Sequence, residues 1–176
     1  DDLRETKRTD GRPLVASEIE LLPQRQGADP VGSAPRLWPW LLAGVSLGLA
    51  ILAFAGRHAR VLAAGASGFW LACGLLGLVL VLSWAFTAHQ ALWANRNLLL
   101  LSPLCLLLLP GAWALLRGRL PSTRFRLLLV VVASLAALAC LPLWLQVLPQ
   151  RNGHWIALLL PIHAAFAWAW SPRPRS

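Results

Sequence analysis

The residue types best suited to chemistry gather in one short stretch between two apolar segments. His89 comes first, and Asn95, Arg96 and Asn97 follow it. An imidazole can move protons near neutral pH, an amide can orient a substrate, and a guanidinium can bind a phosphate. We therefore take His89, Asn95, Arg96 and Asn97 as the candidate residues that face a substrate or a lipid.

A structural interpretation of the same residues stays open. The amides and the histidine could hold a loop by bonding backbone groups at helix ends, while Arg96 contacts a lipid headgroup. No Asp or Glu follows Asp29, so no carboxylate in this part of the chain could orient an imidazole as in a catalytic triad. No cysteine adjoins His89. We therefore assign no catalytic residue within the chain.

The remaining histidines and the cysteines predict neither a metal site nor a cofactor. Three cysteines lie in three different apolar segments, and we expect them to be small buried residues: Cys73, Cys105 and Cys140. His163 lies within an apolar segment, where an imidazole is costly unless it faces the interior of a bundle. Three polar side chains are candidate partners for it: Ser83, Thr87 and Gln146. Their spacing gives no set of converging metal ligands.

The elements that position the candidate residues are long and apolar. Of the 176 residues, 57% are hydrophobic and 13% are charged, too few for the surface of a soluble fold. A helix crosses a bilayer with about 20 apolar residues, and five segments approach or exceed that length: 37–56, 62–88, 98–116, 127–148 and 155–170. The sequence predicts an all-α polytopic membrane protein, a bundle of five transmembrane helices with an extended polar N-terminal tail.

Glycine and proline mark irregular places in these helices. Four glycines in the second helix should let neighbouring helices approach closely: Gly65, Gly68, Gly74 and Gly77. Pro103 and Pro110 in the third helix each remove a backbone donor. The backbone groups left over could shape a cavity or be satisfied by neighbouring helices, and we favour the second.

Charge in the short loops predicts which helix ends face the cytoplasm. The first loop, the third loop and the C-terminus hold most arginines of the region: Arg57, Arg60, Arg117, Arg119, Arg124, Arg126, Arg173 and Arg175. The second loop has Arg96 alone and the fourth has Arg151 alone. The positive-inside rule therefore places the C-terminus in the cytoplasm, and the N-terminus and the candidate residues outside.

Residues 1–36 differ from the rest, because they hold all seven acidic residues of the chain. Thr9 to Pro13 predicts a turn, and residues 14–22 alternate as in a strand, which could not be stable alone. Position 1 is not a methionine, and we expect this extracytoplasmic tail to end a soluble domain that is missing here. The predicted domains are the tail and linker 1–36, the five-helix transmembrane domain 37–170 and the cytoplasmic tail 171–176.

Two function classes are disfavoured. The net charge of +9 is spread over the tail, the loops and the C-terminus without a basic run interleaved with aromatics, so we expect no nucleic-acid partner. Ion-coupled transport generally uses buried Asp, Glu or Lys, and the apolar segments contain none. The basic excess is better explained as a topology signal and as attraction to anionic lipid headgroups.

The order of features resembles a known family. Phe86-Thr87-x-His89 is followed by Asn95-x-Asn97-Leu98-Leu99 and by Pro103-Leu104, with five apolar segments in all. Residues 9–170 resemble the C-terminal five-helix transmembrane domain of the Lnb-like family, described as bacterial lipoprotein N-acyltransferases with a periplasmic papain-like N-terminal domain. Where that family often has an acidic residue just before the histidine, this chain has Ala88.

The resemblance implies a bacterial inner-membrane protein that transfers an acyl chain from a membrane phospholipid to the amino-terminal cysteine of a lipoprotein. The nucleophile would be a cysteine of the missing N-terminal periplasmic domain, and the helices would be the membrane anchor and lipid-access domain. His89, Asn95 and Asn97 would shape the lipid entrance, and Arg96 would bind the donor phosphate. The alternative is a non-catalytic membrane scaffold subunit that packs against another membrane protein.

Overall fold

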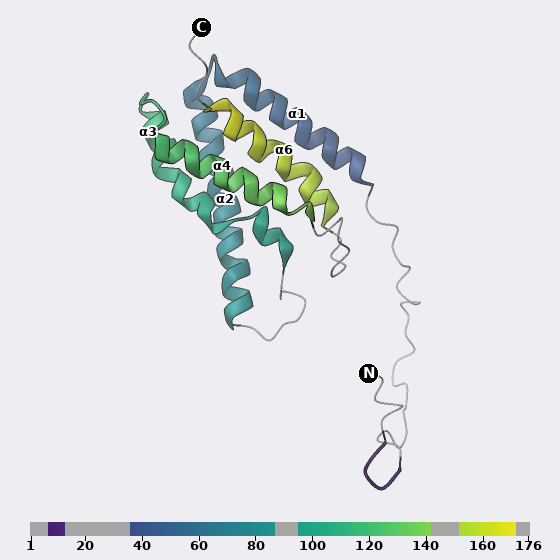
Figure 1. The fold of residues 1–176 in the computed structure, drawn as a ribbon. Helices are drawn as coiled ribbons and strands as arrows, with labels where there is room; N and C mark the ends of the chain where they lie inside the picture. Colours follow the sequence, from purple (N-terminus) through teal and green to yellow (C-terminus); the bar gives the residue numbers. More distant parts are fainter. Residues whose placement is uncertain (1–6, 13–35, 87–94, 142–151, 172–176) are drawn as a thin grey trace. The chain divides into compact units, whose positions relative to one another are not determined.

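The computed structural model describes residues 7–12, 36–86, 95–141 and 152–171. Within these ranges the regular elements are helical, apart from an isolated bridge at Lys7. The chain divides into two units, Asp1–Ala34 and Pro35–Ser176. The second unit holds all the helices (Figure 1), so the predicted all-α fold is confirmed.

The described part of the first unit is the turn that the sequence predicted. The Gly11 N–H donates to the carbonyl of Arg8 at 2.9 Å, and the Arg8 N–H donates to the carbonyl of Arg12 at 2.8 Å. Gly11 has a φ of 81°, a left-handed conformation that glycine adopts without steric cost. The Asp10 carboxylate accepts from the Arg12 N–H at 3.0 Å. The strand expected over residues 14–22 lies outside the described residues.

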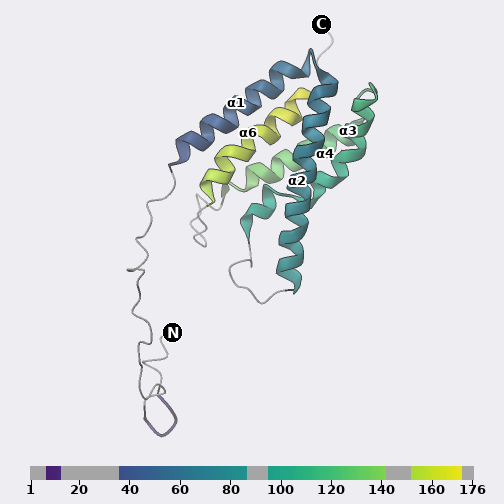
Figure 2. The same cartoon turned by 180° about the vertical axis from the view of Figure 1, so that it is seen from behind.

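Helices α1 (Leu37–Ala55) and α6 (Gly153–Ala169) pack along each other and begin at the same end (Figures 1 and 2). A Cβ at Gly44 of α1 would lie only 2.5 Å from the carbonyl oxygen of Ala157. Pro161 has no N–H to donate to that carbonyl four residues earlier in α6. The Ala157 carbonyl oxygen therefore lacks the N–H donor that an α-helix normally provides, and it faces the Gly44 hydrogen that takes the place of a Cβ. This arrangement favours a weak Cα–H···O contact.

Helix α2 (Ala59–Phe86) packs against a third span that is not one continuous α-helix. The span begins with two 3-10 helices, η2 (Arg96–Leu99) and η3 (Pro103–Leu108), and becomes α3 (Leu109–Leu116). The helical span predicted over residues 98–116 is confirmed, but its first half is 3-10 helix with a break between η2 and η3 (Figure 1).

Two of the four glycines in α2 allow the third span to approach. A Cβ at Gly77 would collide with the carbonyl oxygen of Leu101, and one at Gly74 would lie 2.5 Å from the side chain of Leu106. The close approach predicted for α2 is confirmed at these two positions. A Cβ would meet nothing within 4 Å at the other two, Gly65 and Gly68.

Helix α4 (Thr123–Leu138) begins one turn earlier than the predicted start at residue 127. The reason is a cap, because Ser122 Oγ accepts a hydrogen bond from the Phe125 N–H at 3.2 Å. The other boundaries differ from the predicted ones by no more than a turn. The predicted C-terminal part of this helix, beyond residue 141, lies outside the described residues.

An aromatic cluster joins α2, α4 and α6. Trp70 is fully buried, and its ring centroid lies 5.2 Å from that of Phe166 and 5.8 Å from that of Phe125. Trp170, just after α6, lies 5.7 Å from Trp70. Because the start of α4 and the end of α6 both meet α2 here, these helix ends belong to one end of the unit.

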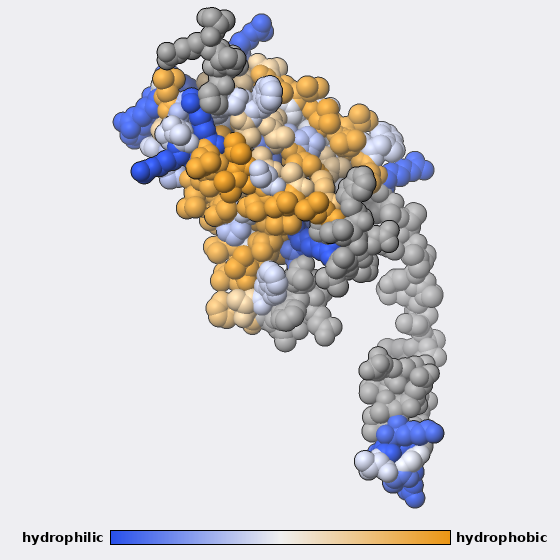
Figure 3. Space-filling model, in the orientation of Figure 1, coloured by the Kyte–Doolittle hydropathy of each residue, from blue (hydrophilic) through white to orange (hydrophobic). Residues whose placement is uncertain are grey.

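The arginine-rich loops lie together at that end. A Cβ at Gly118, between α3 and α4, would be 3.3 Å from the Arg60 guanidinium at the start of α2. We call this region, with the α1–α2 turn and the α3–α4 loop, the arginine end. Figure 3 shows hydrophilic residues gathered at the α3–α4 loop and an apolar surface over the helices.

Length and composition fit the membrane class. Three helical segments are long and apolar enough to cross a bilayer, Leu37–Ala55, Ala59–Phe86 and Arg96–Leu116, and Gly153–Ala169 is a shorter apolar helix. Leucine, valine and tryptophan side chains are exposed along α1 and α2, as expected for surfaces that face lipid.

Candidate lipid-facing site in the third span

The structure places three of the four candidate residues at the start of the third span. Asn95 is the N-cap of η2, and its side-chain oxygen accepts from the Asn97 N–H at 3.0 Å. Arg96 is the first residue of η2, and all three are half-buried. His89 lies outside the described residues, so its predicted place beside them is untested. These residues therefore begin a helical turn that the sequence had assigned to a loop.

Asn97 organises the turn through its backbone. Its carbonyl accepts from the N–H groups of Leu100 at 3.0 Å and Leu101 at 2.7 Å. Its side-chain oxygen, Oδ1, is buried and has no hydrogen-bond partner among the residues that the structure describes. A buried acceptor without a partner is costly, so Oδ1 is a natural acceptor for a donor from a ligand.

The break between η2 and η3 follows from the Ser102-Pro103 pair. Pro103 has no N–H to donate to the carbonyl of Leu100 three residues earlier, where a 3-10 helix would place a bond. The next N–H, that of Leu104, donates instead to Ser102 Oγ at 3.3 Å. The carbonyl of Leu100 is therefore deprived of both its local donors.

His163 of α6 supplies the donor that the break removes. Its Nε2 lies 2.9 Å from the carbonyl oxygen of Leu100, and because a carbonyl only accepts, Nε2 must carry the proton. The imidazole is 2% exposed, and the ring of Phe69 lies 5.1 Å away. The expectation that His163 faces the interior is confirmed. The bond ties the third span to α6 beside the candidate residues.

The sequence suggested side-chain partners for His163, and the structure gives it a backbone carbonyl. Thr87 and Gln146 lie outside the described residues. The signal that could have found the bond is the Ser-Pro pair, because a proline leaves a carbonyl free three residues earlier. A histidine in a neighbouring apolar helix is a suitable donor for it. The expectation that neighbouring helices satisfy the proline breaks is confirmed here.

A second amide near this region lacks a partner. Asn152, the N-cap of α6, is 3% exposed, and its Nδ2 is buried without a hydrogen-bond partner in the described part of the chain. One turn later Ile156 belongs to the same buried cluster as Leu100. The start of the third span and the start of α6 therefore offer one unpaired acceptor and one unpaired donor. We call Asn95, Arg96, Asn97 and the Leu100–His163 bond the polar site.

Among the described residues, no carboxylate accompanies the polar site. The sequence has no carboxylate after Asp29, and among the described residues no three His, Cys, Asp or Glu side chains converge on a common point. Cys73 and Cys105 are buried in the main core, as predicted, and Cys140 is half-buried. The arrangement can bind and orient a polar group through hydrogen bonds and the Arg96 charge.

Comparison with known proteins matches the Lnb transmembrane domain over residues 29–171. The chain belongs to this family. The match includes every helix described above and all four candidate residues. No curated protein and no solved structure matches the chain. The Lnb family therefore confirms a five-helix transmembrane domain, and it leaves the role of the polar site to be argued from its geometry.

Proposed function

We propose that this Lnb domain is the membrane anchor and lipid-access domain of a lipoprotein N-acyltransferase. The acyl donor would be a membrane phospholipid, and the acceptor would be the amino-terminal cysteine of a lipoprotein. The observation that carries the proposal is the unpaired Oδ1 of Asn97, held on a turn beside a cationic side chain within an apolar helical unit.

The polar site has the chemistry that a phospholipid headgroup region requires. A guanidinium such as that of Arg96 binds phosphate through several N–H groups. Asn97 Oδ1 can accept from a hydroxyl or an ammonium of a headgroup, which a purely apolar surface cannot do. His89 would stand at the same entrance, seven residues before Arg96 in the sequence.

The covalent step is assigned to a different part of the protein. A thiolate nucleophile in an N-terminal periplasmic domain would take the acyl group and pass it to the lipoprotein amine. The cysteines described here are buried or half-buried among apolar helices, which suits packing better than nucleophilic attack. In this proposal the helices supply the lipid, and the soluble domain supplies the chemistry.

The proposal also fixes an orientation in the bacterial inner membrane. The arginine end would face the cytoplasm, and the N-terminus would lie outside with the polar site at the outer leaflet. Support comes from the contact between the first and third loops, because the positive-inside rule needs these arginine-rich loops on one side.

Lipoprotein acylation by the full-length protein tests the proposal. We expect Asn97→Ala to lower the rate roughly fivefold to tenfold, the value of a lost hydrogen bond, with the amount of protein in the membrane unchanged. The measurement is the mass shift of the lipoprotein amino terminus in membranes. His154→Ala is the matched control, because His154 contacts the Trp40 ring 5.5 Å away, outside the polar site. Unchanged acylation in Asn97→Ala would favour the non-catalytic scaffold instead.

A further inference from the structure

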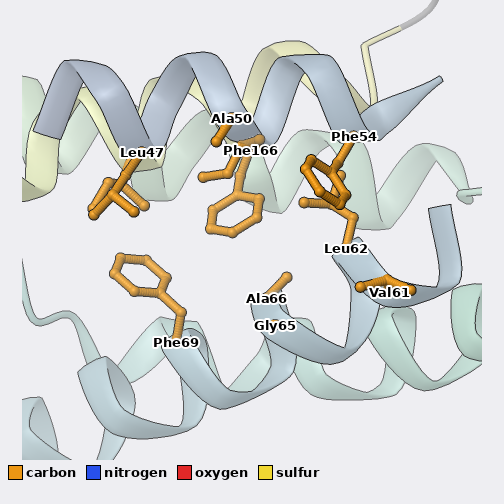
Figure 4. A pocket seen from close by; sticks show the side chains of 11 residues that line it. Leu47, Ala50, Phe54, Val61, Leu62, Gly65, Ala66, Phe69 and Phe166 are labelled. Carbon is orange, nitrogen blue, oxygen red and sulfur yellow. The ribbon is translucent and has the colours of Figure 1, made fainter. Parts of the chain in front are cut away.

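An apolar groove runs between α1, α2 and α6, and no residue of η2 lines it. Its volume is about 290 Å³. Figure 4 shows α1 and α2 as its two walls, with Phe166 of α6 between them. Large apolar side chains line it from all three helices: Leu47, Phe54, Val61, Phe69, Ile162 and Phe166.

Small residues keep the groove hollow. Ala50 of α1 and Gly65 and Ala66 of α2 face it (Figure 4). A Cβ at Gly65 would meet nothing within 4 Å, so no side chain of the described protein fills the space beside it. In a soluble protein this gap would expose apolar surface to water, but in a bilayer a hydrocarbon chain can occupy it.

The length of the groove suits one leaflet. Its α1 wall extends from Leu47 to Phe54, about 10 Å along the helix axis at 1.5 Å per residue. A single leaflet contributes about half of the 30 Å hydrocarbon thickness. The groove therefore accommodates much of one acyl chain of a lipid. That lipid would belong to the leaflet at the α1–α2 turn, where α1 and α2 join and close the groove.

The closed end of the groove is strongly cationic. Phe54 and Val61 flank the α1–α2 turn, which carries Arg57 and Arg60, both exposed. No Asp or Glu follows Asp29 in the sequence, so no side chain of the transmembrane domain can neutralise these arginines. The α3–α4 loop beside Arg60 adds further arginines. An apolar groove with exposed, uncompensated arginines in the turn at one end is complementary to a lipid with an anionic headgroup.

We propose that the groove binds an anionic glycerophospholipid of the leaflet at the arginine end. One acyl chain lies between α1, α2 and α6, and the phosphate lies against Arg57 and Arg60. This site goes beyond the proposed acyl transfer, because it needs no covalent step and Asn97 does not line it. The bound lipid fills the space between α1 and α2, which contact each other little along their lengths.

Lipid binding to the full-length protein in detergent tests the site. The probes are phosphatidylglycerol and phosphatidylethanolamine of matched chain length, and native mass spectrometry counts bound lipids. We expect the wild type to prefer phosphatidylglycerol, and Gly65→Leu to lower its binding by about tenfold, because the new side chain displaces methylene groups from the groove. Gly68→Leu is the matched control, since Gly68 has the same open surroundings but does not line the groove.

Two further variants distinguish binding of the acyl chain in the groove from binding of the phosphate by the arginines. Ala50→Leu fills the groove from α1 and should lower phosphatidylglycerol binding as much as Gly65→Leu does. Ala50→Leu therefore still tests the groove if Gly65→Leu fails to fold. The double variant Arg57→Gln, Arg60→Gln should lower phosphatidylglycerol binding about tenfold and so remove its preference over phosphatidylethanolamine. The reason is that each arginine near an anionic group adds to binding. Unchanged binding in both groove variants, equal loss in Gly68→Leu, or a preference that survives removal of the arginines would each overturn the proposal. The lipid-binding experiment does not measure acylation. If it contradicts the groove proposal, the proposed function is therefore unaffected.

Discussion

The polar site and the arginine end differ in where their polar groups find partners. At the polar site the bonds are internal, because Asn95 caps η2, Ser102 caps η3 and His163 satisfies the Leu100 carbonyl. At the arginine end Arg57, Arg60 and Arg119 are exposed, and no carboxylate follows Asp29 in the sequence. The first region is therefore organised mainly by hydrogen bonds within the protein. In the second, Arg117 lies 4.9 Å from the centroid of the Trp113 ring, and the other exposed arginines are open to lipid headgroups and water.

In the proposed orientation the polar site and the arginine end face opposite sides of the membrane. Cysteine labelling gives an all-or-none test of this orientation. We place single cysteines at position 92 and at Arg119, with the native cysteines replaced by alanine. The first should react with an impermeant maleimide from outside, and the second only after lysis, because arginine-rich loops stay in the cytoplasm. Labelling of both from the same side would contradict the topology.

The α2 face that packs against the third span should tolerate a larger side chain far less than the open face of the same helix at Gly68. Gly77→Leu drives a side chain into the Leu101 carbonyl and should cost about 3 kcal/mol or prevent folding. Gly68→Leu in the same helix meets open space and should leave the unfolding temperature nearly unchanged. The measurement is thermal unfolding in detergent. Equal stability of the two variants would mean that α2 and the third span do not pack as described.

The His163 bond should control how well η2 and η3 are ordered. His163→Ala leaves the Leu100 carbonyl unsatisfied, at a cost of about 1–3 kcal/mol. Hydrogen exchange at Leu100 and Leu101, whose N–H groups donate to Asn97, should accelerate roughly tenfold. His163→Gln, which keeps an amide donor, should recover part of the protection. Unchanged exchange in His163→Ala would show that the bond does not hold the turn.

Hydropathy predicted the five helices well because membrane helices follow from continuous apolar length. It could not predict the break at Leu100 to Ser102, since leucines continue through it and only the Ser102-Pro103 pair interrupts the backbone bonding. The earlier start of α4 followed from a serine cap, a local bond that hydropathy does not register.

The candidate site was predicted in part. Its residue types and its position at the start of the third span followed from polarity between apolar segments. The link to His163 did not, because a contact between residues 63 apart depends on how α6 packs. The groove was not predicted either, since it is created by Gly65 and Ala50 on different helices. Close contacts at Gly44 were missed for the same reason.

The central claim is that His163 positions the turn on which Asn97 receives the lipid. Acylation by the full-length protein should be compared for Asn97→Ala, His163→Ala and the double variant, with His154→Ala as control. If both residues act through one turn, the double variant should be no slower than the slower single variant, because residues in one network are not additive. Rate losses that multiply, or His163→Ala acylating at the wild-type rate, would contradict the account.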